Sequence, residues 1–453
     1  MNPFACVASC EEKKFYQALQ SAMPSQGLFA EKSWRQSPEP FFISEQLHAK
    51  LERLGALLHL FNKACDLLYR QSVAGKEPPW IAALLDRGKP KELIELARDK
   101  IFRGETSRVI RPDLLITSEG LVICELDQIP GGMGLTAWLQ KVYTALGYEI
   151  IGGPEGMLEG FRSMFPRVQP GEGVDIVISQ ESAMYVPEMR YLVDSLTQRF
   201  PAIPWRLLDP EYQGTWASYV YRFFELFDRK NVACAPLLFS RAQAGEMIIT
   251  PPPKPQLEEK LLFALFWMKP LEAFWRRQLG ERAMGELKKM IPYSWVLTPE
   301  PLPPQAVYPQ LEVQSWNEVA HFSQKQRELV IKISGFEERA WGSRGVHVGH
   351  DLSKTEWTLA LQGALEEYEE HPHLLQRFHH SLVQSHRYFM SDTHIMAMPG
   401  RARLTPYYFV SEDKVTLAGG LATICPADKK ILHGMSDSTL APLALEKKAC
   451  QIS

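Results

Sequence analysis

Apolar and polar positions alternate on both sides of a short turn in residues 111–138. The apolar runs LLI and LVI flank the turn-forming letters SEG, a pattern that predicts two antiparallel β-strands joined as a hairpin. Side chains two residues apart share one face of a strand, so Arg111 lies with Asp113, and Glu125 lies with Asp127. The start of the first strand lies beside the end of the second. We therefore expect these four charged side chains to converge.

Three carboxylates in such a cluster repel one another unless a cation or a phosphate lies among them, because like charges in contact away from bulk water cost several kcal/mol. Oxygen ligands suit Mg²⁺, which proteins usually hold with a few carboxylates and substrate phosphates. An arginine beside them is suited to bind phosphate oxygens through two hydrogen bonds. The alternative is a hairpin whose acidic side chains only face water, and the hairpin alone does not decide between the two.

The segments around the hairpin have helical apolar spacing. This spacing predicts that residues 1 to about 100 form helices that cover a face of another domain. It predicts a further helix over 135–146. The bend IPGGMG at 129–134 comes directly before that helix. Backbone N–H groups ahead of a helix bind anions, so a substrate carboxylate or phosphate is one interpretation of this bend, and a plain turn that needs positive φ is the other.

From residue 174 onward, strands alternate with helices. We predict strands over 174–178, 205–208 and 232–238, and helices over 187–197 and 219–227. Strands separated by helices predict a mainly parallel sheet covered on both faces, a Rossmann-like lobe. The GxGxxG fingerprint of a dinucleotide site is absent from this lobe.

The following segments place two lysines ahead of a glycine-containing loop. A helical region over 257–275 has Lys260 near its start, and a strand over 329–333 carries Lys332 on the face opposite its isoleucines. A strand lysine followed by the loop 335–349 is a common way to hold nucleotide phosphates, although the P-loop motif GxxxxGK[ST] is absent. Taken alone, Lys260 is typical of a surface lysine, and Lys332 of a strand lysine that reaches solvent. The other predicted elements here are a helix over 354–368, a strand over 374–378, and a strand pair over 401–410 and 416–423.

Composition narrows the classes of function. A chain of 453 residues with 45% hydrophobic residues is long enough for two or three packed units. Its net charge of −3 provides no broad basic surface for nucleic acid or anionic lipid. Apolar runs are too short for a membrane span, and the first residues show no secretion leader. We expect a cytoplasmic protein without nucleic-acid or membrane partners.

Cysteine and histidine positions predict no metal site. The seven cysteines form no CxxC pair, which favours reduced thiols, and Cys6 with Cys10 is too weak a pattern for zinc. Strand alternation predicts that the side chain of Cys124 lies on the face opposite the carboxylates. We therefore expect Cys124 to be a core residue rather than a nucleophile. Histidines are dense between 371 and 394, but their spacing matches no metal motif, so we expect them on a solvated loop or helix face.

Together, the segments RPDLLITSEGLVICELDQIPGG, VIKISGFEERAWGSRG, LLQRF and RARLTPYYFV resemble the ligase domain of glutathionylspermidine synthetases, in content and in order. The resemblance covers about residues 105 to 445. It implies a permuted ATP-grasp fold, in which metal ligands on an early hairpin meet phosphate-binding lysines encoded much later.

The resemblance also assigns roles to individual positions. The matches are Arg111 for the transferred phosphate; Asp113, Glu125 and Asp127 for Mg²⁺; Lys260 and Lys332 for the other phosphates of ATP; Gly342, Arg344 and Gly345 for the flap over them; and Gln376 for the adenine. Two departures stand out. Asp127 replaces the family's asparagine, and the bend IPGGMG replaces the polar segment that helps the family hold its thiol tripeptide substrate. The metal and ATP positions match, whereas the acceptor pocket does not.

The expected architecture is a multi-lobed protein of the α/β and α+β classes, an ATP-grasp fold with a Rossmann-like lobe ahead of it. Its four parts are a helical N-terminal region over 1–104, a metal-binding hairpin and helix over 105–150, the Rossmann-like lobe over 151–250, and the nucleotide-binding lobes over 251–453.

The expected function is that of a ligase that uses ATP and Mg²⁺ to join a small-molecule or peptide carboxylate, through an acyl phosphate, to an amine. Two alternatives remain open: an inactive ATP-grasp-like binding or scaffold protein, and a kinase-like enzyme whose phosphorylated product leaves without capture by an amine. Retention of all four charged hairpin residues favours the ligase. The sequence identifies neither acid nor amine, and it leaves a homodimer open.

Overall fold

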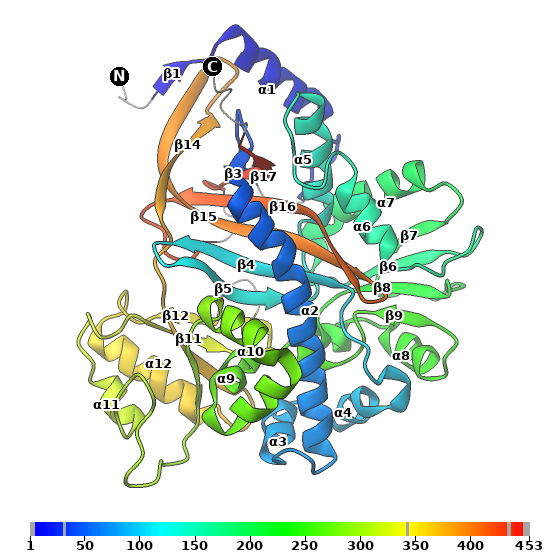
Figure 1. Cartoon of the computed structure of the whole chain (residues 1–453). Helices are drawn as coiled ribbons and strands as arrows, with labels where there is room; N and C mark the ends of the chain where they lie inside the picture. The colour runs from blue at the N-terminus through cyan, green and yellow to red at the C-terminus, as the bar shows by residue number, and fades with distance from the viewer. Residues whose placement is uncertain (1–4, 30–32, 341–343, 433–435, 447–453) are drawn as a thin grey trace.

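A nine-stranded sheet dominates the structure, a computed structural model that describes residues 5–29, 33–340, 344–432 and 436–446. Its main strand order is β2-β17-β16-β15-β4-β5, with β1 and β14 paired to β15 and β3 paired to β17. The strands are β1 Ala5–Val7, β2 Arg35–Gln36, β3 Phe41–Ile43, β4 Val109–Thr117, β5 Gly120–Asp127, β14 Val383–Phe389, β15 His394–Ser411, β16 Lys414–Pro426 and β17 Thr439–Leu445. The predicted hairpin is confirmed as β4 and β5, and long strands from the C-terminal part of the chain join it (Figure 1).

The N-terminal region is mainly helical, as predicted, but it also contributes the short strands β1, β2 and β3 to the main sheet, which were not predicted. Its longest helix runs across that sheet (Figure 1). This helix, α2 Glu45–Val73, begins where the Ser44 hydroxyl accepts a hydrogen bond from the N–H of Leu47. Its apolar positions recur every three or four residues, so one stripe, which includes Leu51, Leu58 and Phe61, is buried in the largest hydrophobic core. The other helices of this region are α1 Cys10–Ala22, α3 Trp80–Asp86 and α4 Lys91–Arg98.

A second sheet is four-stranded and fully parallel, in the order β7-β6-β8-β9. Its strands are β6 Val174–Ile178, β7 Trp205–Leu208, β8 Tyr219–Phe223 and β9 Ile248–Thr250. The helices nearby are α5 Met133–Ala145, α6 Gly156–Ser163, α7 Val186–Arg199 and α8 Ala235–Gln243. One face contributes Ile176 to the core that includes α6 and α7, and the other contributes Val177 to the core that includes α8. The prediction of a parallel sheet covered on both faces is confirmed.

Two predicted elements of this lobe are wrong. Residues 219–227 were expected to be helical, but Tyr219–Phe223 is a strand that is buried throughout. Residues 232–238 were expected to be a strand, but a helix begins at Ala235, with Pro236 in its first turn. A short apolar run has no decisive period, whereas proline in a first turn is typical of a helix start.

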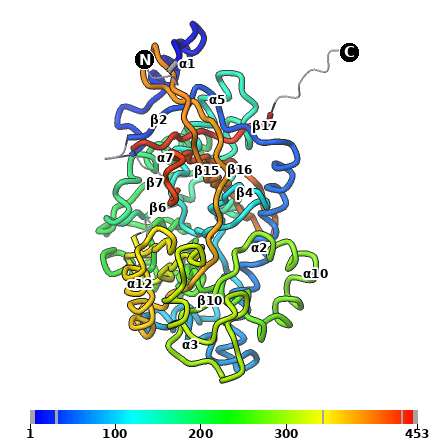
Figure 2. Tube along the Cα trace, turned by 90° about the vertical axis from the view of Figure 1, so that its left-hand side faces the viewer, coloured from blue at the N-terminus to red at the C-terminus, as the bar shows by residue number. Residues whose placement is uncertain are grey.

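The third sheet is antiparallel, in the order β10-β13-β11-β12, and lies in the lower part of the molecule in Figure 2. Its strands are β10 Ser294–Leu297, β11 Leu329–Ile333, β12 Val346–Val348 and β13 His373–Arg377, and its helices are α9 Leu261–Trp267, α10 Glu272–Met290, α11 Trp316–Ala320 and α12 Lys354–Glu366. The helical region predicted over 257–275 divides into α9 and α10. None of the helices that the structure describes is long and apolar enough to cross a membrane.

Candidate functional site

The hairpin places its charged residues in two direct cross-strand pairs. Arg111 lies opposite Asp127, and Asp113 lies opposite Glu125. Nearer the turn the register differs by one residue, because a β-bulge places Cys124 as an extra residue in β5. The predicted convergence of the four charged residues is therefore present in the structure.

The bulge also overturns the prediction for Cys124. In a regular strand, Val122 and Glu125 would lie on opposite faces, because they are three residues apart. The extra residue brings Val122, Cys124 and Glu125 to the wall of the same pocket. Cys124 is therefore partly exposed at this pocket rather than directed away from the carboxylates. Burial raises the pKa of its thiol to about 11, so the thiol is not an activated nucleophile.

Side chains from distant segments neutralise the hairpin carboxylates. Asp113 lies 3.2 Å from Nη2 of Arg111 and accepts a 2.8 Å hydrogen bond from Nη1 of Arg403 on β15. Asp127 lies 2.8 Å from Nη2 of Arg111, and Glu125 lies 2.8 Å from Nζ of Lys260. The sequence predicted that the carboxylates need an external cation for charge balance. In the structure, cations of the chain itself balance them. Arg403 received no role from the sequence, since only the pairing of β15 with β4 brings it to the hairpin.

Local charges shift the pKa of several of these groups. Burial alone would raise the pKa of Glu125, but Lys260 and Lys332 lower it below its usual value. Burial raises the pKa of Asp127, and the neighbouring carboxylates Glu125 and Asp113 add to that rise against the opposing charge of Arg111. Glu125 therefore favours its ionised form and Asp127 resists ionisation.

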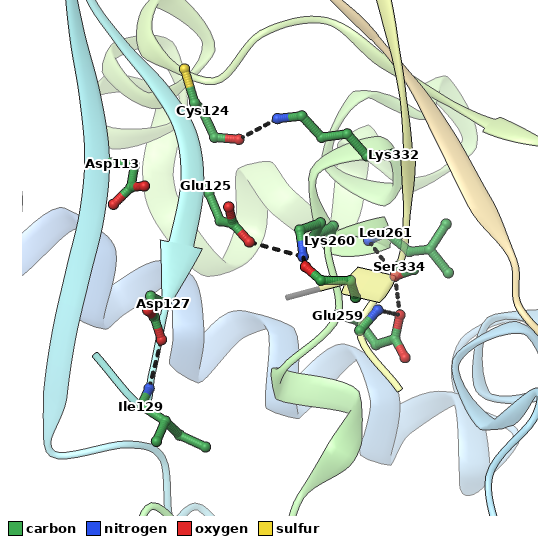
Figure 3. Close-up of polar contacts among 12 residues, drawn as sticks. Asp113, Cys124, Glu125, Asp127, Ile129, Glu259, Lys260, Leu261, Lys332 and Ser334 are labelled. Atoms are coloured by element: carbon green, nitrogen blue, oxygen red, sulfur yellow. Dashed lines mark hydrogen bonds and ion pairs between the residues drawn. The ribbon is translucent and has the colours of Figure 1, made fainter. Parts of the chain in front are cut away.

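Lys332 points from the third sheet toward the hairpin (Figure 3). Its Nζ donates a 2.8 Å hydrogen bond to the carbonyl oxygen of Cys124 and another of 2.8 Å to Oε1 of Gln376 on β13. Nε2 of Gln376 in turn donates to the hydroxyl of Ser294 on β10. Burial lowers the pKa of Lys332, against the raising influence of Cys124 and Glu125. These contacts hold the lysine and the predicted adenine-side glutamine at one pocket.

That pocket has a volume of about 110 Å³ and lies between the hairpin and the third sheet. Asp113, Glu125, Lys332 and Gln376 all line it. Typical small-molecule pockets measure about 300–1,000 Å³, so this conformation accommodates part of a nucleotide rather than all of it. Lys430 and the two residues after it close one side.

Two of the three predicted flap residues, Arg344 and Gly345, do not line this pocket. Gly342 lies outside the described residues. Arg344 forms ion pairs of 2.7 Å with Glu181 and with Glu338, and the N–H of Gly345 donates to the carbonyl of Arg339. The role of this loop as a cover over phosphates stays a prediction.

The glycine bend before α5 is an anion site, but its anion belongs to the chain. The buried carboxylate of Glu188, from α7, accepts hydrogen bonds of 2.6 Å from the N–H of Gly132 and 3.0 Å from that of Leu135. Gly132 has φ of 85°, which explains the glycine. Burial raises the pKa of Glu188 to about 7, against the lowering effect of these backbone donors. The interpretation of this bend as a substrate-anion site is therefore wrong for these N–H groups.

The hairpin residues fit Mg²⁺ as partial ligands. Oδ1 of Asp113 is buried and accepts no hydrogen bond, and its charged neighbour is the Arg111 guanidinium 3.2 Å away, so a metal ion at this oxygen would take the place of Arg111. Among the described residues, however, the ligand atoms of Asp113, Glu125 and Asp127 do not all lie within 4.8 Å of one another. Mg²⁺ is commonly held by one or two carboxylates together with substrate phosphates rather than by a complete protein cage. The donor set therefore suits a metal that arrives with a nucleotide.

A larger cavity, of about 570 Å³, lies elsewhere, between α2, the loop before β4, the edge strand β9 and the β15–β16 turn. It shares no lining residue with the pocket at the hairpin. The charged residues that converge at the hairpin therefore lie at a smaller cavity, and cavity size alone would not have located them.

Comparison with known proteins supports the fold. No protein-family model and no curated protein sequence matches this chain. A solved structure of a glutathione synthetase-like effector from Globodera pallida, in its apoform, is similar over 97% of this chain and 98% of that chain, with a TM-score of 0.56 and 11% identity. A putative gamma-glutamylcysteine synthetase from Methylobacillus flagellatus covers 85% and 88%, with a TM-score of 0.42 and 10% identity, a similarity too low to carry an argument. The first likeness shows a glutathione synthetase-like fold, consistent with an ATP-grasp-like architecture, and does not single out glutathionylspermidine synthetases.

Proposed function

We propose that this chain is an ATP- and Mg²⁺-dependent ligase that joins a carboxylate to an amine. The observation that carries the proposal is the meeting of Lys260 and Lys332 with Glu125, a residue encoded far earlier in the chain. A pocket lined by Asp113 and Glu125 of the hairpin and by Lys332 of the third sheet, with Lys260 paired to Glu125 beside it, suits a metal-bound triphosphate. The glutathione synthetase-like fold supports the same class of reaction.

In this proposal the third sheet binds the nucleotide. Lys332 and Lys260 supply positive charge to the α- and β-phosphates, and Gln376 lies on the adenine side. Arg111 binds the γ-phosphate in exchange for one of the two carboxylates with which its guanidinium is paired at the start of the hairpin.

Asp113, Glu125 and Asp127 would hold the metal. When bound, Mg²⁺ neutralises negative charge on the β- and γ-phosphates during phosphoryl transfer. The replacement of asparagine by Asp127 adds a formal charge at this position, and burial together with the neighbouring carboxylates raises the pKa of Asp127, so a further cation there would favour its ionised form.

The reaction has two steps. A substrate carboxylate oxygen attacks the γ-phosphorus of ATP, the bond to the β-phosphate oxygen breaks, and ADP leaves with that electron pair. An amine nitrogen then attacks the acyl carbon, inorganic phosphate leaves, and the amine loses a proton. Lys332 and Arg111 hold the phosphates during the first step, and exclusion of water protects the acyl phosphate until the second.

The acceptor is expected to differ from the thiol tripeptide of glutathionylspermidine synthetases. The bend IPGGMG replaces the family's polar segment, and Glu188 already binds the N–H groups of this bend. The proposal therefore names the class, a small-molecule or peptide carboxylate and an amine, and not the compounds.

The first test is thermal unfolding with ATP and Mg²⁺ present together. We expect the nucleotide to raise the midpoint, since a ligand that binds only the folded state stabilises it. No shift at millimolar MgATP would favour the alternative of an inactive scaffold protein. This alternative is a specific second candidate because each hairpin carboxylate is already paired with a cation of the chain.

The second test uses variants at the pocket. Lys332→Met and Glu125→Gln should each reduce ADP formation at least a hundredfold, because each removes a charge that binds the phosphates or the metal. Glu119→Gln, in the exposed hairpin turn, is the matched control and should keep the wild-type rate. Wild-type rates in both pocket variants would contradict the proposal. A phosphorylated acid that accumulates whether or not amine is present would indicate the kinase-like alternative.

A further inference from the structure

Three residues far apart in the sequence meet at one edge of the antiparallel third sheet. Glu328 comes directly before β11, His350 follows β12, and His380 follows β13. Because neighbouring strands run in opposite directions, the start of β11 lies beside the ends of β12 and β13. Backbone hydrogen bonds fix this edge, from the N–H of Gly349 to the carbonyl of Leu329 and from the N–H of Phe378 to that of Glu328.

The side chains of these residues approach one another at distances that suit metal ligands. Oε2 of Glu328 lies 2.9 Å from Nε2 of His380 and 3.5 Å from Nδ1 of His350. One ligand atom from each of the three residues lies within 4.8 Å of the others. Ligands at about 2.0–2.1 Å from a tetrahedral Zn²⁺ lie about 3.3 Å apart, so small side-chain movements suffice to bind the ion.

His350 provides a second, independent indication. Its side chain is only 9% exposed, and neither ring nitrogen has a hydrogen bond, although an Asp351 oxygen lies 3.7 Å from Nε2. Buried polar atoms normally have partners, and an unbonded imidazole that faces a carboxylate and a second imidazole is suited to a cation between them. The ring of Phe378 packs edge-on against both His350 and His380 and shields the cluster from one side.

We propose that Glu328, His350 and His380 form a binding site for a transition-metal ion, with Zn²⁺ as the best match. Two imidazoles with one carboxylate favour zinc or a similar ion over Mg²⁺, which prefers oxygen ligands alone. Water or Asp351 completes the coordination, and Asp351 at present pairs with Lys430. This site is separate from the hairpin carboxylates and does not depend on the proposed ligase activity.

The metal would join the ends of three strands next to the nucleotide pocket. Phe378 and His379, which line that pocket, lie between β13 and His380. A metal bound at His380 therefore restrains the segment that forms one wall of the pocket. We assign the ion a structural role at this wall.

The test measures zinc bound to the full chain. The purified protein is equilibrated with Zn²⁺, free metal is removed by gel filtration, and bound metal is counted by mass spectrometry; a chelator competition gives the affinity. We expect one zinc per chain. His380→Gln and Glu328→Gln should each weaken binding at least tenfold, and because both side chains are about half exposed, both variants should keep the apoprotein's circular dichroism spectrum. His321→Gln, an exposed histidine on the same lobe, is the matched control and should bind zinc like the wild type.

Co²⁺ replaces zinc as a spectroscopic probe, and its visible absorption should lose intensity in His380→Gln and not in His321→Gln. Absence of zinc binding by the wild type, or equal binding by the wild type and both ligand variants, would overturn the proposal. Zinc that is lost in a Cys6→Ser, Cys10→Ser double variant or in Glu125→Gln, but kept in His380→Gln, would also overturn it, because the ion would then belong to the exposed thiols or to the hairpin.

Discussion

At the scale of single residues, the charged groups around the hairpin are balanced within the chain. Arg111 forms ion pairs with Asp113 and Asp127, and Lys260 forms one with Glu125. Arg403 is a second cation paired with Asp113. Charges packed this closely are costly to leave unpaired in a partly buried site. A bound nucleotide must therefore exchange partners with these side chains rather than enter a site of uncompensated negative charge.

Glu188 is a buried carboxylate whose stability effect depends on pH. Its pKa of about 7 in the folded state lies above the usual 4.5, so the folded state holds its proton more tightly than the unfolded state. Wild-type stability should therefore fall as pH rises from about 4.5 to about 7, by up to about 3 kcal/mol from this group. Glu188→Gln has no ionisable group at this position, so its stability lacks this pH dependence. Urea unfolding at pH 5 and pH 8 should show that the difference in the free energy of unfolding between the wild type and Glu188→Gln is smaller at pH 8.

The exposed Glu149, just after α5, provides the control. Glu149→Gln should follow the wild-type profile across this range. Parallel profiles for Glu188→Gln and the wild type would show that Glu188 ionises in the folded protein at its ordinary pKa.

Much of the site follows from local sequence, and the rest depends on contacts between distant residues. Strand alternation is a property of neighbouring residues, so it placed Arg111 with Asp113 and Glu125 with Asp127. The bulge at Cys124 is one extra residue that alternation does not reveal. His350 and His380 meet only through the pairing of separate strands, which is why their spacing resembles no metal motif.

At the scale of elements, the sequence distinguishes long periodic segments better than short apolar ones. α2 shows its period over eight turns and was predicted, whereas β8, with five buried residues, was taken for a helix. The strand lies between β6 and β9 and is buried on both faces, and even its one charged residue, Arg222, is fully buried in an ion pair with Glu258. Polar and exposed positions therefore do not alternate along it. Tertiary environment, rather than local preference, decides such segments.

The contact between α5 and α7 depends on a glycine. A Cβ at Gly134 would overlap the backbone carbonyl of Glu188, so Gly134→Ala must separate the two helices. We expect a loss of about 3 kcal/mol or more in the free energy of unfolding, at the upper end of overpacking effects. Gly363→Ala, in α12, where a Cβ meets nothing within 4 Å, should instead stabilise by about 0.5–1 kcal/mol. Chemical denaturation measures both, and equal effects would contradict the close approach of α7.

At the scale of the whole molecule, the N-terminal helices belong to the same core as the lysine segment. One hydrophobic cluster contains residues of α2, the hairpin, α9, α10 and β15. Two buried ion pairs reinforce this connection: Lys254 with Asp66 of α2, and Lys89 with Glu259, the residue before Lys260. The helical region predicted over 1–104 therefore supports the position of Lys260, while the predicted boundaries of the four parts stay a prediction.

The pair of Asp66 and Lys254 tests this connection directly. Both side chains are about 1% exposed, their charged atoms lie 2.8 Å apart, and Lys254 also donates to the carbonyl of Glu105. Asp66→Asn leaves the ammonium buried without a countercharge, which should cost about 3–5 kcal/mol in the free energy of unfolding. Asp413→Asn removes an equivalent ion pair with Lys63 at an exposed position and should cost under about 1 kcal/mol. If the lysine segment depends on α2, Asp66→Asn should also reduce the stabilisation by MgATP at temperatures where the protein stays folded, and the exposed control should not. An Asp66→Asn protein as stable as Asp413→Asn would mean that the helices and the lysine segment are joined by apolar contacts alone.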